Sequence, residues 1–336
     1  MSMRKTSRRV MHVSLAGVDN RHGVGRDIWL LENVLESERA QVTVNVPGRV
    51  SVVDKLWREL IRKGLKRPPY DIGLFVETPW PHFFDYSRIN CLIPNQEWLR
   101  DEDIAALQRV DRILCKTHAA LEVFERRGFP STYIGFSGQD RLLAVQSMDY
   151  GAWLHVAGKS LWRGTESVIA VWARHPEWPT LTIVQNPKVA PVVRVRAQNI
   201  NHHTAFIDDA ELRQLQNRCG VHLCPSEMEG YGQTISESMS CGAVVMTTNA
   251  SPMNEMVTTN RGVLVPFAAS ESHCWGMRYF VDEGILEAQI NEVIAMPVEL
   301  MRVLGGAARS WFEDNDCAFR ERFPNVLRQL ADESCN

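Results

Sequence analysis

Two glutamates with seven residues between them stand on either side of a segment that suits a phosphate. Glu229 precedes a short glycine-bearing loop, residues 230–232, and Glu237 lies within the helix predicted over residues 233–241. A glycine loop that leads into a helix points free backbone N–H groups and a partial positive charge outward, which favours phosphate binding. A carboxylate accepts hydrogen bonds from two hydroxyl groups at once, so each glutamate suits a polyol. The spacing therefore favours a phosphate between two polyols, which is the composition of a nucleotide sugar.

The neighbouring elements must position these glutamates. The apolar run over residues 221–224 predicts the end of a buried strand, and Gly242 predicts the end of the helix. Residues 243–247 predict the next short buried strand. Strand, loop, helix and strand in this order form the unit that builds parallel sheets. The residues alone leave an ordinary alternative open, in which Glu229 lies on an exposed turn and Glu237 on an exposed helix face.

The same stretch resembles a known enzyme family. It reads EGYGQTISE, then SMSCGAVVMTT, then NEMV, and it is similar to the signature of retaining glycosyltransferases with the GT-B fold, above all those of the large group numbered family 4. The resemblance covers most of the chain. It implies an α/β protein with two Rossmann-like domains, each a doubly wound parallel sheet, that face a central cleft. It also implies a retaining, hexosyltransferase-type enzyme that takes its sugar from a UDP- or GDP-sugar.

The resemblance implies a role for each residue of the donor site. Glu237 would hold the ribose hydroxyls, and Glu229 would hold hydroxyls of the transferred sugar and so act in catalysis. Lys159 and Arg163 would bind the diphosphate and stabilise the charge that grows on it as it leaves. The family has Arg before Lys, whereas this chain has Lys159 before Arg163, so a bidentate arginine contact would move to the second position. The other donor-binding residues implied are Gly23, Gly25, Gly230, Tyr231, Gly232 and Gln233.

The first of these glycines belong to the start of the chain. Residues 10–16 predict a buried strand, residues 17–25 a glycine-bearing loop, and residues 26–35 a helix. Doubly wound folds bring backbone N–H groups to a ligand at such a loop. Gly23 and Gly25 match the family's loop beside the donor diphosphate, and a plain turn between strand and helix is the alternative.

A catalytic position departs from the family pattern. Many members have a histidine near the reacting sugar, after the strand that corresponds here to residues 90–93. This chain has Asn95, Gln96 and Glu97 after that strand. Glu97 is therefore the replacement candidate as a catalytic residue, and His82, which follows the preceding strand, is the second candidate.

The succession of elements predicts two domains and a final helix. Residues 1–145 form an N-terminal Rossmann-like domain on the acceptor side, and residues 146–312 a C-terminal Rossmann-like domain that binds the nucleotide sugar. Residues 313–336 form a helix that we expect to cross back to the first domain. Pro324 predicts a break in this helical region. A chain of 336 residues is long enough for such an arrangement.

Composition is that of a globular protein, with 45% hydrophobic and 23% charged residues. A net charge of −3 gives no bulk attraction to nucleic acid or anionic lipid. The eight cysteines form no C-x-x-C pair, which argues against zinc and favours reduced thiols. The basic N-terminus has only a short apolar run, so we expect a strand there and not a signal peptide. No segment reaches the roughly 20 apolar residues of a membrane span. We therefore expect a cytoplasmic protein.

No metal and no other cofactor is expected. Residues 101–103 (DED) form a D-x-D triplet, a pattern that elsewhere binds a metal-bound nucleotide sugar. Here the triplet precedes an apolar helical run, where acidic residues favour a helix start. Residues 314–316 are interpreted in the same way. The pair His202 and His203 has no partner at the spacing of metal ligands.

The sequence leaves the acceptor open among glycans, lipids and small molecules. A basic amphipathic segment from Lys55 to Arg67 suits peripheral contact with an anionic membrane, and a solvated surface helix is the alternative. A modified nucleic-acid base is another possible acceptor, which the acidic pI near 6.4 disfavours. The alternative from a different class is a non-catalytic sugar-nucleotide-binding protein of the same fold, which the missing histidine supports.

Overall fold

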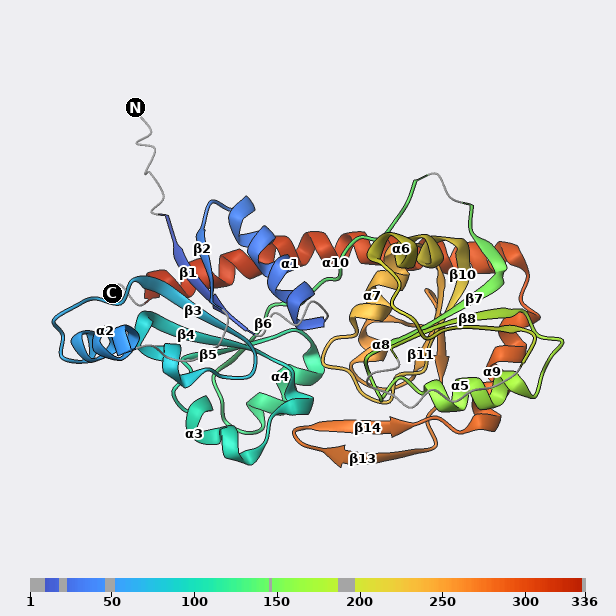
Figure 1. Ribbon diagram of the computed structural model, residues 1–336, viewed down its shortest axis with the longest axis horizontal. Coiled ribbons are helices and arrows are strands. Elements are labelled where there is room, and N and C mark those ends of the chain that lie inside the picture. The colour runs from blue at the N-terminus through green and yellow to red at the C-terminus, as the bar shows by residue number, and fades with distance from the viewer. Residues whose placement is uncertain (1–9, 18–22, 46–51, 145–146, 187–196, 334–336) are drawn as a thin grey trace. The chain divides into compact units, whose positions relative to one another are not determined.

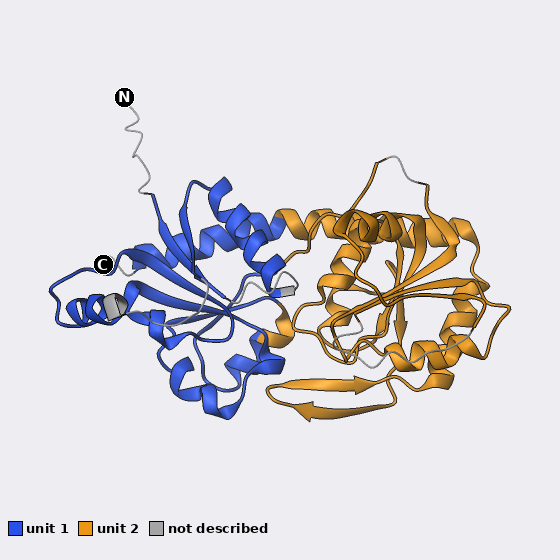
Figure 2. Cartoon of the chain, viewed as in Figure 1, with its two compact units in different colours: residues 1–116, 121–135, 318–336 blue, residues 117–120, 136–317 orange. Residues whose placement is uncertain are grey.

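The computed structural model describes residues 10–17, 23–45, 52–144, 147–186 and 197–333 of the chain. The chain divides into two compact units, coloured blue and orange in Figure 2. Unit 1 comprises residues 1–116, 121–135 and 318–336, and unit 2 comprises residues 117–120 and 136–317. Unit 1 thus passes into unit 2 after Gly135 rather than at the expected residue 145, and it includes the end of the chain.

Unit 1 contains a parallel six-stranded sheet with the order β2-β1-β3-β4-β5-β6. The order reverses at β1 and β3, which are neighbours although β2 separates them in sequence. The inner strands are apolar on both faces because helices cover both faces of a parallel sheet. The strands are β1 (His12–Ala16), β2 (Gln41–Asn45), β3 (Tyr70–Glu77), β4 (Ser87–Pro94), β5 (Arg112–Cys115) and β6 (Ser131–Tyr133).

Helices flank the sheet of unit 1, with α1 on one side and α3 and α4 on the other (Figure 1). Leu31, Val34 and Leu35 of α1 are fully buried. The helix begins at Gly23, so Gly23 and Gly25 lie in its first turn and not in the expected loop, of which residues 18–22 are outside the described part of the chain. The helices are α1 (Gly23–Ser37), α2 (Val52–Arg62), α3 (Ile104–Leu107) and α4 (His118–Glu125), with 3-10 helices η1 (Pro81–Tyr86), η2 (Gln96–Trp98) and η3 (Asp101–Asp103).

Unit 2 contains a second parallel six-stranded sheet, with the order β12-β11-β10-β7-β8-β9. The order reverses between β7 and β10, which pair with each other at the centre. All six residues of β10 are buried, as the apolar run in the sequence predicts. The strands are β7 (Asp149–Gly158), β8 (Thr180–Gln185), β9 (Ile200–His203), β10 (Cys219–Cys224), β11 (Val244–Thr248) and β12 (Val263–Val265).

Helices also lie on both sides of the second sheet, α6 and α7 on one and α5 and α9 on the other (Figure 1). The ring of Trp172, in α5, packs in the core against those of Trp153 and Trp178, with centroids 5.1 and 5.0 Å away. Asp208 caps α6 by accepting a hydrogen bond from the backbone of Glu211. The helices are α5 (Thr165–Ala173), α6 (Asp209–Arg218), α7 (Gln233–Ser240), α8 (Met253–Met256), α9 (Glu283–Ile294) and α10 (Val298–Glu333).

Unit 2 carries a feature that the sequence did not predict, the antiparallel hairpin β13 (Ala269–His273) and β14 (Gly276–Phe280). An isolated hairpin is only marginally stable. This one is fastened to the rest of unit 2 by Arg278, which pairs with Glu227 at 2.6 Å, and by Tyr279, whose N–H donates to the Glu227 carbonyl.

The predicted break at Pro324 is wrong, because α10 continues through it to Glu333. A proline inside a helix costs about 3 kcal/mol. Phe319, Phe323 and Leu327 lie on one face of this part of α10 and are fully buried in unit 1. Burial of each contributes roughly 1.5–3 kcal/mol, which together outweighs the proline.

Two adjacent glycines in α10 provide a test of its packing. A Cβ on Gly305 would lie 2.1 Å from the carbonyl oxygen of Gly242, whereas a Cβ on Gly306 would meet nothing within 4 Å. Gly305→Ala should therefore lower the melting temperature, since backbone must move. Gly306→Ala should raise it slightly, because alanine favours the helix by up to about 1 kcal/mol. Equal effects of the two substitutions in thermal denaturation would contradict this packing.

Candidate functional site

The candidate site of unit 2 lies where its strand order reverses. In open α/β sheets, ligands bind outside the carboxyl ends of the strands at such a point. Here the two strands are β7 and β10, and the segments that follow them, residues 159–164 and 225–232, lead into α5 and α7. These segments contain most of the donor-binding residues that the sequence predicts.

A close backbone contact brings the two segments together. Gly164 has a left-handed backbone, with φ of 67°, and a Cβ there would lie 2.6 Å from the carbonyl oxygen of Pro225. Only glycine fits both conditions. The Glu227 N–H also donates to the carbonyl of Trp162, at 2.9 Å. The segment that carries Arg163 is therefore held against the segment that carries Glu229.

Arg163 and Glu229 form an ion pair in this contact. Arg163 Nη1 donates to Glu229 Oε1, and the Ser226 hydroxyl donates to the same oxygen at 2.7 Å. Only 16% of the Arg163 side chain and 8% of the Glu229 side chain are exposed. The exposed-turn alternative for Glu229 is therefore wrong. The buried Nε of Arg163 has no hydrogen-bond partner among the described residues, so the guanidinium keeps a donor for a ligand.

The other predicted cation, Lys159, follows β7 and is exposed. It comes directly after Gly158, whose φ is 57°. The structure thus places both predicted cations on the segment that joins β7 to α5.

The start of α7 has the geometry expected of a phosphate-binding turn. Gly232, the residue before the helix, has φ of 106°, and a Cβ there would lie 2.6 Å from Met256 Cε. The positive φ therefore favours glycine at this position. Gly230 is buried beside it, and Gln233 begins the helix, with its side chain 3.4 Å from the Ser137 carbonyl. The first backbone N–H groups of a helix have no partner within the helix, so this end suits an anion.

Tyr231 has a structural contact that the sequence did not reveal. Its ring is 6% exposed, and its hydroxyl donates to the Phe136 carbonyl at 2.9 Å. The Phe136 ring also packs against it, with centroids 5.2 Å apart. The side chain therefore fixes the glycine loop against residue 136, and any contact with a donor falls to its backbone.

Glu237 lies on the buried face of α7, with 2% exposed, so its exposed-face alternative is also wrong. Its Oε2 accepts a hydrogen bond from Gln216 Nε2 at 3.0 Å. Burial of a carboxylate is costly unless hydrogen bonds compensate it.

A buried histidine lies behind the pair of Arg163 and Glu229. His155 of β7 contacts the Leu223 carbonyl through Nδ1 at 2.7 Å and the Thr165 hydroxyl through Nε2 at 2.9 Å. Burial, with a smaller contribution from the nearby Arg163 charge, lowers the pKa of His155 to about 4. A carbonyl only accepts, so Nδ1 carries the proton of the neutral ring and Nε2 accepts from Thr165. His155 thereby links β7, β10 and the start of α5.

The sequence analysis missed Ser226, His155 and Gln216. Ser226 follows directly on the predicted strand, which was a usable signal. His155 and Gln216 are polar residues within a predicted strand and helix, and their partners are 68 and 21 residues away in the chain. No local pattern indicates such contacts.

The predicted catalytic candidates of unit 1 follow its strands β3 and β4. Glu97 lies in η2 and is 5% exposed. His82 lies in η1, where its ring packs on Phe83 with centroids 4.2 Å apart. Burial, followed by the Arg58 charge, lowers the pKa of His82. The catalytic roles of Glu97 and His82 stay predictions.

A polar cluster that the sequence analysis did not single out joins three strand ends of unit 1. Asn95 donates to Glu77 Oε1 at 3.4 Å and accepts from Lys116, which also pairs with Asp27 at 3.1 Å. Burial raises the pKa of Glu77, although Asn95 and Lys116 act against it. Glu77 has φ of 74°, a strained value for a non-glycine residue. Such strain clusters at functional positions.

A cavity of about 360 Å³ borders the segment after β7. Glu227, Arg278 and Gln185 are among its polar lining residues, and neither Glu229 nor Glu237 lines it. The cavity therefore lies beside the predicted donor site and is not formed by its two glutamates.

Among the described residues, no three His, Cys, Asp or Glu side chains lie together as ligands. His202 contacts Gln185 Oε1 at 3.0 Å. Asp103 accepts from the Arg100 N–H at 2.8 Å and so caps η3, as the sequence predicts. The described part of the chain also has no helix long and apolar enough to cross a membrane.

Part of the chain matches a known protein family. Residues 193–294 match the family model described as "Glycosyl transferases group 1". This region of unit 2 carries Glu229 and Glu237. No curated protein sequence matches the chain.

Solved structures resemble nearly the whole chain. Sucrose-phosphate synthase from Thermosynechococcus elongatus is 14% identical, with a TM-score of 0.71 over 95% of this chain and 99% of that one. Anabaena HepE in complex with UDP-glucose is 14% identical, with a TM-score of 0.70 over 95% and 100%. A chain of the GtfA/B complex is 13% identical, with a TM-score of 0.60, and 83% of this chain covers 61% of that one. At such identities the likeness establishes the fold, which is GT-B, and the predicted fold class is confirmed.

The protonation of His155 gives a pH test of the site. The folded pKa is about 4 against an ordinary 6.5, so the unfolded state binds more protons between these values. The free energy of unfolding should therefore fall as the pH is lowered through this window. Ring shifts in an NMR titration should show the Nδ1–H tautomer and no titration near pH 6.5. His175, whose pKa its contacts with Glu177 and Glu287 raise, is the internal control. Titration of His155 at or above its ordinary value would contradict the assignment.

Proposed function

We propose that the protein is a retaining glycosyltransferase of the family 4 type. It moves a sugar from a nucleotide-sugar donor, a UDP- or GDP-sugar, to a glycan, lipid or small-molecule acceptor. One observation carries the proposal: two buried carboxylates, Glu229 and Glu237, stand on either side of the N-terminus of α7, and the first is paired with Arg163. The match of residues 193–294 to "Glycosyl transferases group 1" supports it.

The diphosphate of the donor lies at the centre of this proposed site. Arg163, Lys159 and the first N–H groups of α7 supply positive charge and hydrogen-bond donors for the diphosphate. They stabilise the charge that develops on the leaving group, which is the electrostatic part of catalysis. Anabaena HepE, which shares the fold, is in complex with UDP-glucose.

The two carboxylates bind opposite ends of the donor. Glu237 lies inside α7, beyond the turn that meets the phosphate, and binds the ribose hydroxyls. Glu229 precedes the turn and binds the hydroxyls of the transferred sugar, which places the anomeric carbon. Arg163, as the partner of Glu229, joins the sugar subsite to the diphosphate subsite.

No divalent metal takes part in this proposal. Neither D-x-D triplet follows a strand of a sheet: Asp103 caps η3, and residues 314–316 lie inside α10 and not at a helix start as predicted. Lys159 and Arg163 supply the charge that a metal provides to the diphosphate in other enzymes. On the acceptor side, Glu97 is the candidate catalytic residue and His82 the second.

Two alternatives lead to different outcomes. A non-catalytic sugar-nucleotide-binding protein would bind the donor and never release the nucleoside diphosphate. An enzyme for a modified nucleic-acid base would have the same donor site and differ only in the acceptor. The retained cations and carboxylates favour an enzyme, and the net charge of −3 disfavours a nucleic-acid acceptor.

Separate substitution of the two carboxylates tests the function. Glu237→Ala should weaken binding of UDP or GDP and of the sugar nucleotide. Glu229→Ala should leave nucleoside diphosphate binding nearly intact and reduce turnover of the sugar nucleotide. Each loss should be about ten- to a hundred-fold, because a hydrogen bond to a charged group contributes roughly 1.5–3 kcal/mol. Calorimetry measures the binding, and release of nucleoside diphosphate measures the turnover.

Glu227→Ala is the matched control, because this carboxylate belongs to the same segment but pairs with Arg278. This substitution should leave nucleotide binding and sugar-nucleotide turnover nearly unchanged. Binding and turnover should also be the same in the presence of EDTA. Loss of UDP and GDP binding in Glu229→Ala, together with normal binding in Glu237→Ala, would contradict the assignment. Activity that EDTA abolishes and manganese or magnesium restores would contradict the metal-independent mechanism.

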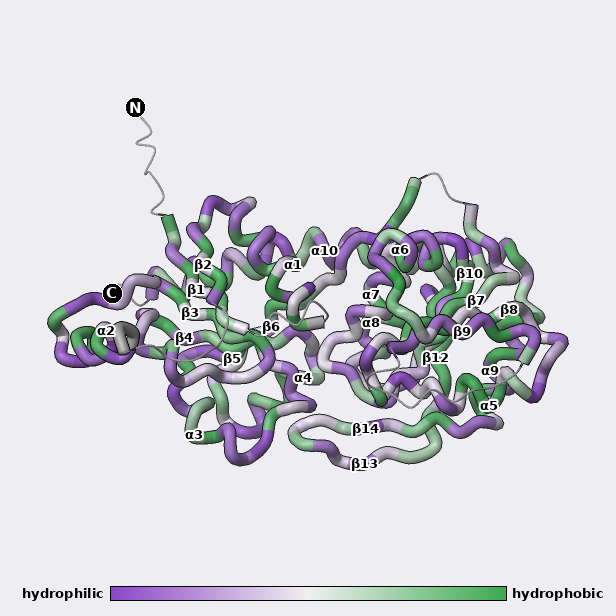
Figure 3. The backbone as a smooth tube through the Cα atoms, in the orientation of Figure 1, coloured by the Kyte–Doolittle hydropathy of each residue, from purple (hydrophilic) through white to green (hydrophobic). Residues whose placement is uncertain are grey.

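A membrane-facing role of α2 is a further part of the proposal. Leu56 and Trp57 of this helix are 61% and 42% exposed, whereas Arg58 and Arg62 bond to η1 through the His82 carbonyl and Asp85 at 2.9 Å each. The helix thus leaves Leu56 and Trp57 exposed, whereas Arg58 is partly buried against η1. Figure 3 shows this mixture of hydrophobic and hydrophilic residues along α2.

Cations surround the exposed apolar residues of this segment. Leu65 is 67% exposed, and Lys66 lies over the Trp57 ring at 5.1 Å. Lys55, Lys63, Lys66 and Arg67 are exposed as well. Apolar side chains among basic ones suit a bilayer with anionic lipids. The helix itself ends at Arg62, so the predicted helical segment to Arg67 is too long.

Vesicle binding tests this surface. The protein should sediment with vesicles of phosphatidylcholine and phosphatidylglycerol more than with phosphatidylcholine alone, and less at high salt. Leu56→Ser with Trp57→Ser should abolish most of this binding. Leu300→Ser with Val303→Ser, which removes exposed apolar residues of α10, is the control and should not. Equal binding of both double variants would exclude α2 as the contact.

A further inference from the structure

A chain of buried hydrogen bonds leads from Glu237 to a buried arginine. Gln216 of α6 donates from Nε2 to Glu237 Oε2 at 3.0 Å, and its Oε1 accepts from Arg141 Nε at 2.8 Å. Gln216 and Arg141 are 0% exposed and Glu237 is 2% exposed. An arginine only donates, and a carboxylate oxygen accepts, so the orientation of the amide is determined.

Arg141 is held on every side of its guanidinium. Nη1 donates to Gln139 Oε1 and to Asp209 Oδ2, and Nη2 donates to the Asp209 carbonyl, at 2.8–3.1 Å. A buried arginine costs several kcal/mol of desolvation unless such contacts satisfy it. Its guanidinium therefore has one arrangement, and it presents a fixed Nε–H to Gln216.

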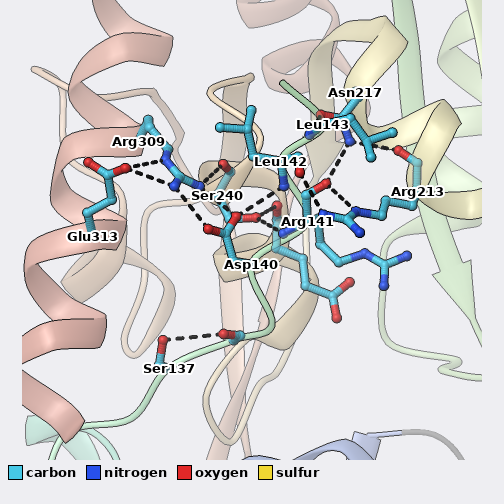
Figure 4. A network of polar contacts seen from close by, with 12 residues as sticks. Ser137, Asp140, Arg141, Leu142, Leu143, Arg213, Asn217, Ser240, Arg309 and Glu313 are labelled. Carbon is cyan, nitrogen blue, oxygen red and sulfur yellow. Dashed lines mark hydrogen bonds and ion pairs between the residues drawn. The ribbon is translucent and has the colours of Figure 1, made fainter. Parts of the chain in front are cut away.

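The backbone of Arg141 is fixed to both helices of the site. Its N–H donates to the Ser240 hydroxyl at the end of α7, and its carbonyl accepts from Asn217 Nδ2 of α6 at 2.8 Å. Figure 4 shows these contacts, together with Arg213 and Arg309, around Arg141. The Ser240 hydroxyl in turn donates to the Glu237 carbonyl at 2.7 Å. Backbone and side chain of Glu237 are thus both tied to Arg141, one through Ser240 and one through Gln216.

We infer that Gln216, with Arg141 behind it, is a positioning residue that aims the Glu237 carboxylate at the two ribose hydroxyls of the nucleotide. This inference rests on the proposed function. A carboxylate inside a helix has several rotamers, and a bond to one of its oxygens restricts them. The carboxylate is then preorganised for the hydroxyls, which improves binding by reducing the cost of ordering. If Gln216 had only a structural role, its loss would weaken binding of nucleotides with and without the ribose hydroxyls to the same extent.

The ribose hydroxyls themselves provide the discriminating measurement. Calorimetry would compare UDP and GDP with their 2′,3′-dideoxy analogues, which lack both hydroxyls. For whichever of UDP and GDP binds more tightly, the wild-type protein should bind the natural nucleotide about ten- to a hundred-fold more tightly than its dideoxy analogue, as a bond to a charged group implies. The ratio of these two affinities is the measured quantity. Gln216→Met, which keeps the length and removes both hydrogen bonds, should reduce this ratio to a few-fold.

Asn217→Leu is the matched control. Asn217 is the next residue of α6 and is only 3% exposed, and it bonds to the backbone of Arg141 and Leu143, not to the Arg141 guanidinium that contacts Gln216. Its loss should lower the melting temperature and leave the ratio at the wild-type value. If Gln216→Met does not fold, Gln216→Glu keeps an acceptor for Arg141 and sets a like charge against Glu237, which should lower the ratio as well.

The outcomes separate this inference from the function on which it rests. A wild-type ratio in a folded Gln216 variant, with tight binding of the natural nucleotide, would overturn the positioning role and leave the proposed function standing. An equal fall of the ratio in Asn217→Leu would also overturn it, because the effect would then be structural. Failure of the wild-type protein to bind either nucleotide would overturn the proposed function and the inference together.

Discussion

The site of unit 2 depends on the close approach of Gly164 to Pro225, the contact that joins the carboxyl ends of β7 and β10. A side chain at Gly164 would collide with the Pro225 carbonyl, and that glycine also has a left-handed backbone. The contact sets Arg163 against Glu229. The buried pair costs desolvation free energy that its attraction only partly offsets, so its value lies in a fixed geometry rather than in stability. An arginine held in this way would not have to become ordered on binding the diphosphate of the proposed donor.

Residues around α7 are likewise held in fixed positions by contacts within unit 2. Gly232 gives the turn its shape, the Tyr231 hydroxyl fixes it to the Phe136 carbonyl, and Gln216 fixes the Glu237 carboxylate. His155 stays neutral because burial lowers its pKa to about 4, so it links β7 to the start of α5 without adding charge. Polar groups around the predicted donor are thus bonded to each other or to the backbone, as rigid sites require.

The sequence predicted what depends on local pattern. Apolar runs predicted the strands, and the glycine after the helix predicted the end of α7, because these signals lie within a few residues of each other. The hairpin β13–β14 was missed, and one of the contacts that hold it to unit 2 is with Glu227, which is distant in the sequence. The break at Pro324 was wrong because buried phenylalanines outweigh the proline. Arg141, Gln216 and Glu237 come together only in the folded chain, and the roles of Glu97, His82, Gly23 and Gly25 stay predictions.

The central claim is that Glu237 binds the nucleoside half of a nucleotide sugar and Glu229 the sugar half. The most direct measurement is a crystal structure of the protein with UDP or GDP. We expect the ribose hydroxyls within hydrogen-bond distance of Glu237, the diphosphate against Arg163 and the N-terminus of α7, and Glu229 beside an empty space for the sugar. A ribose bound to Glu229, or a nucleotide that touches neither glutamate, would contradict the account.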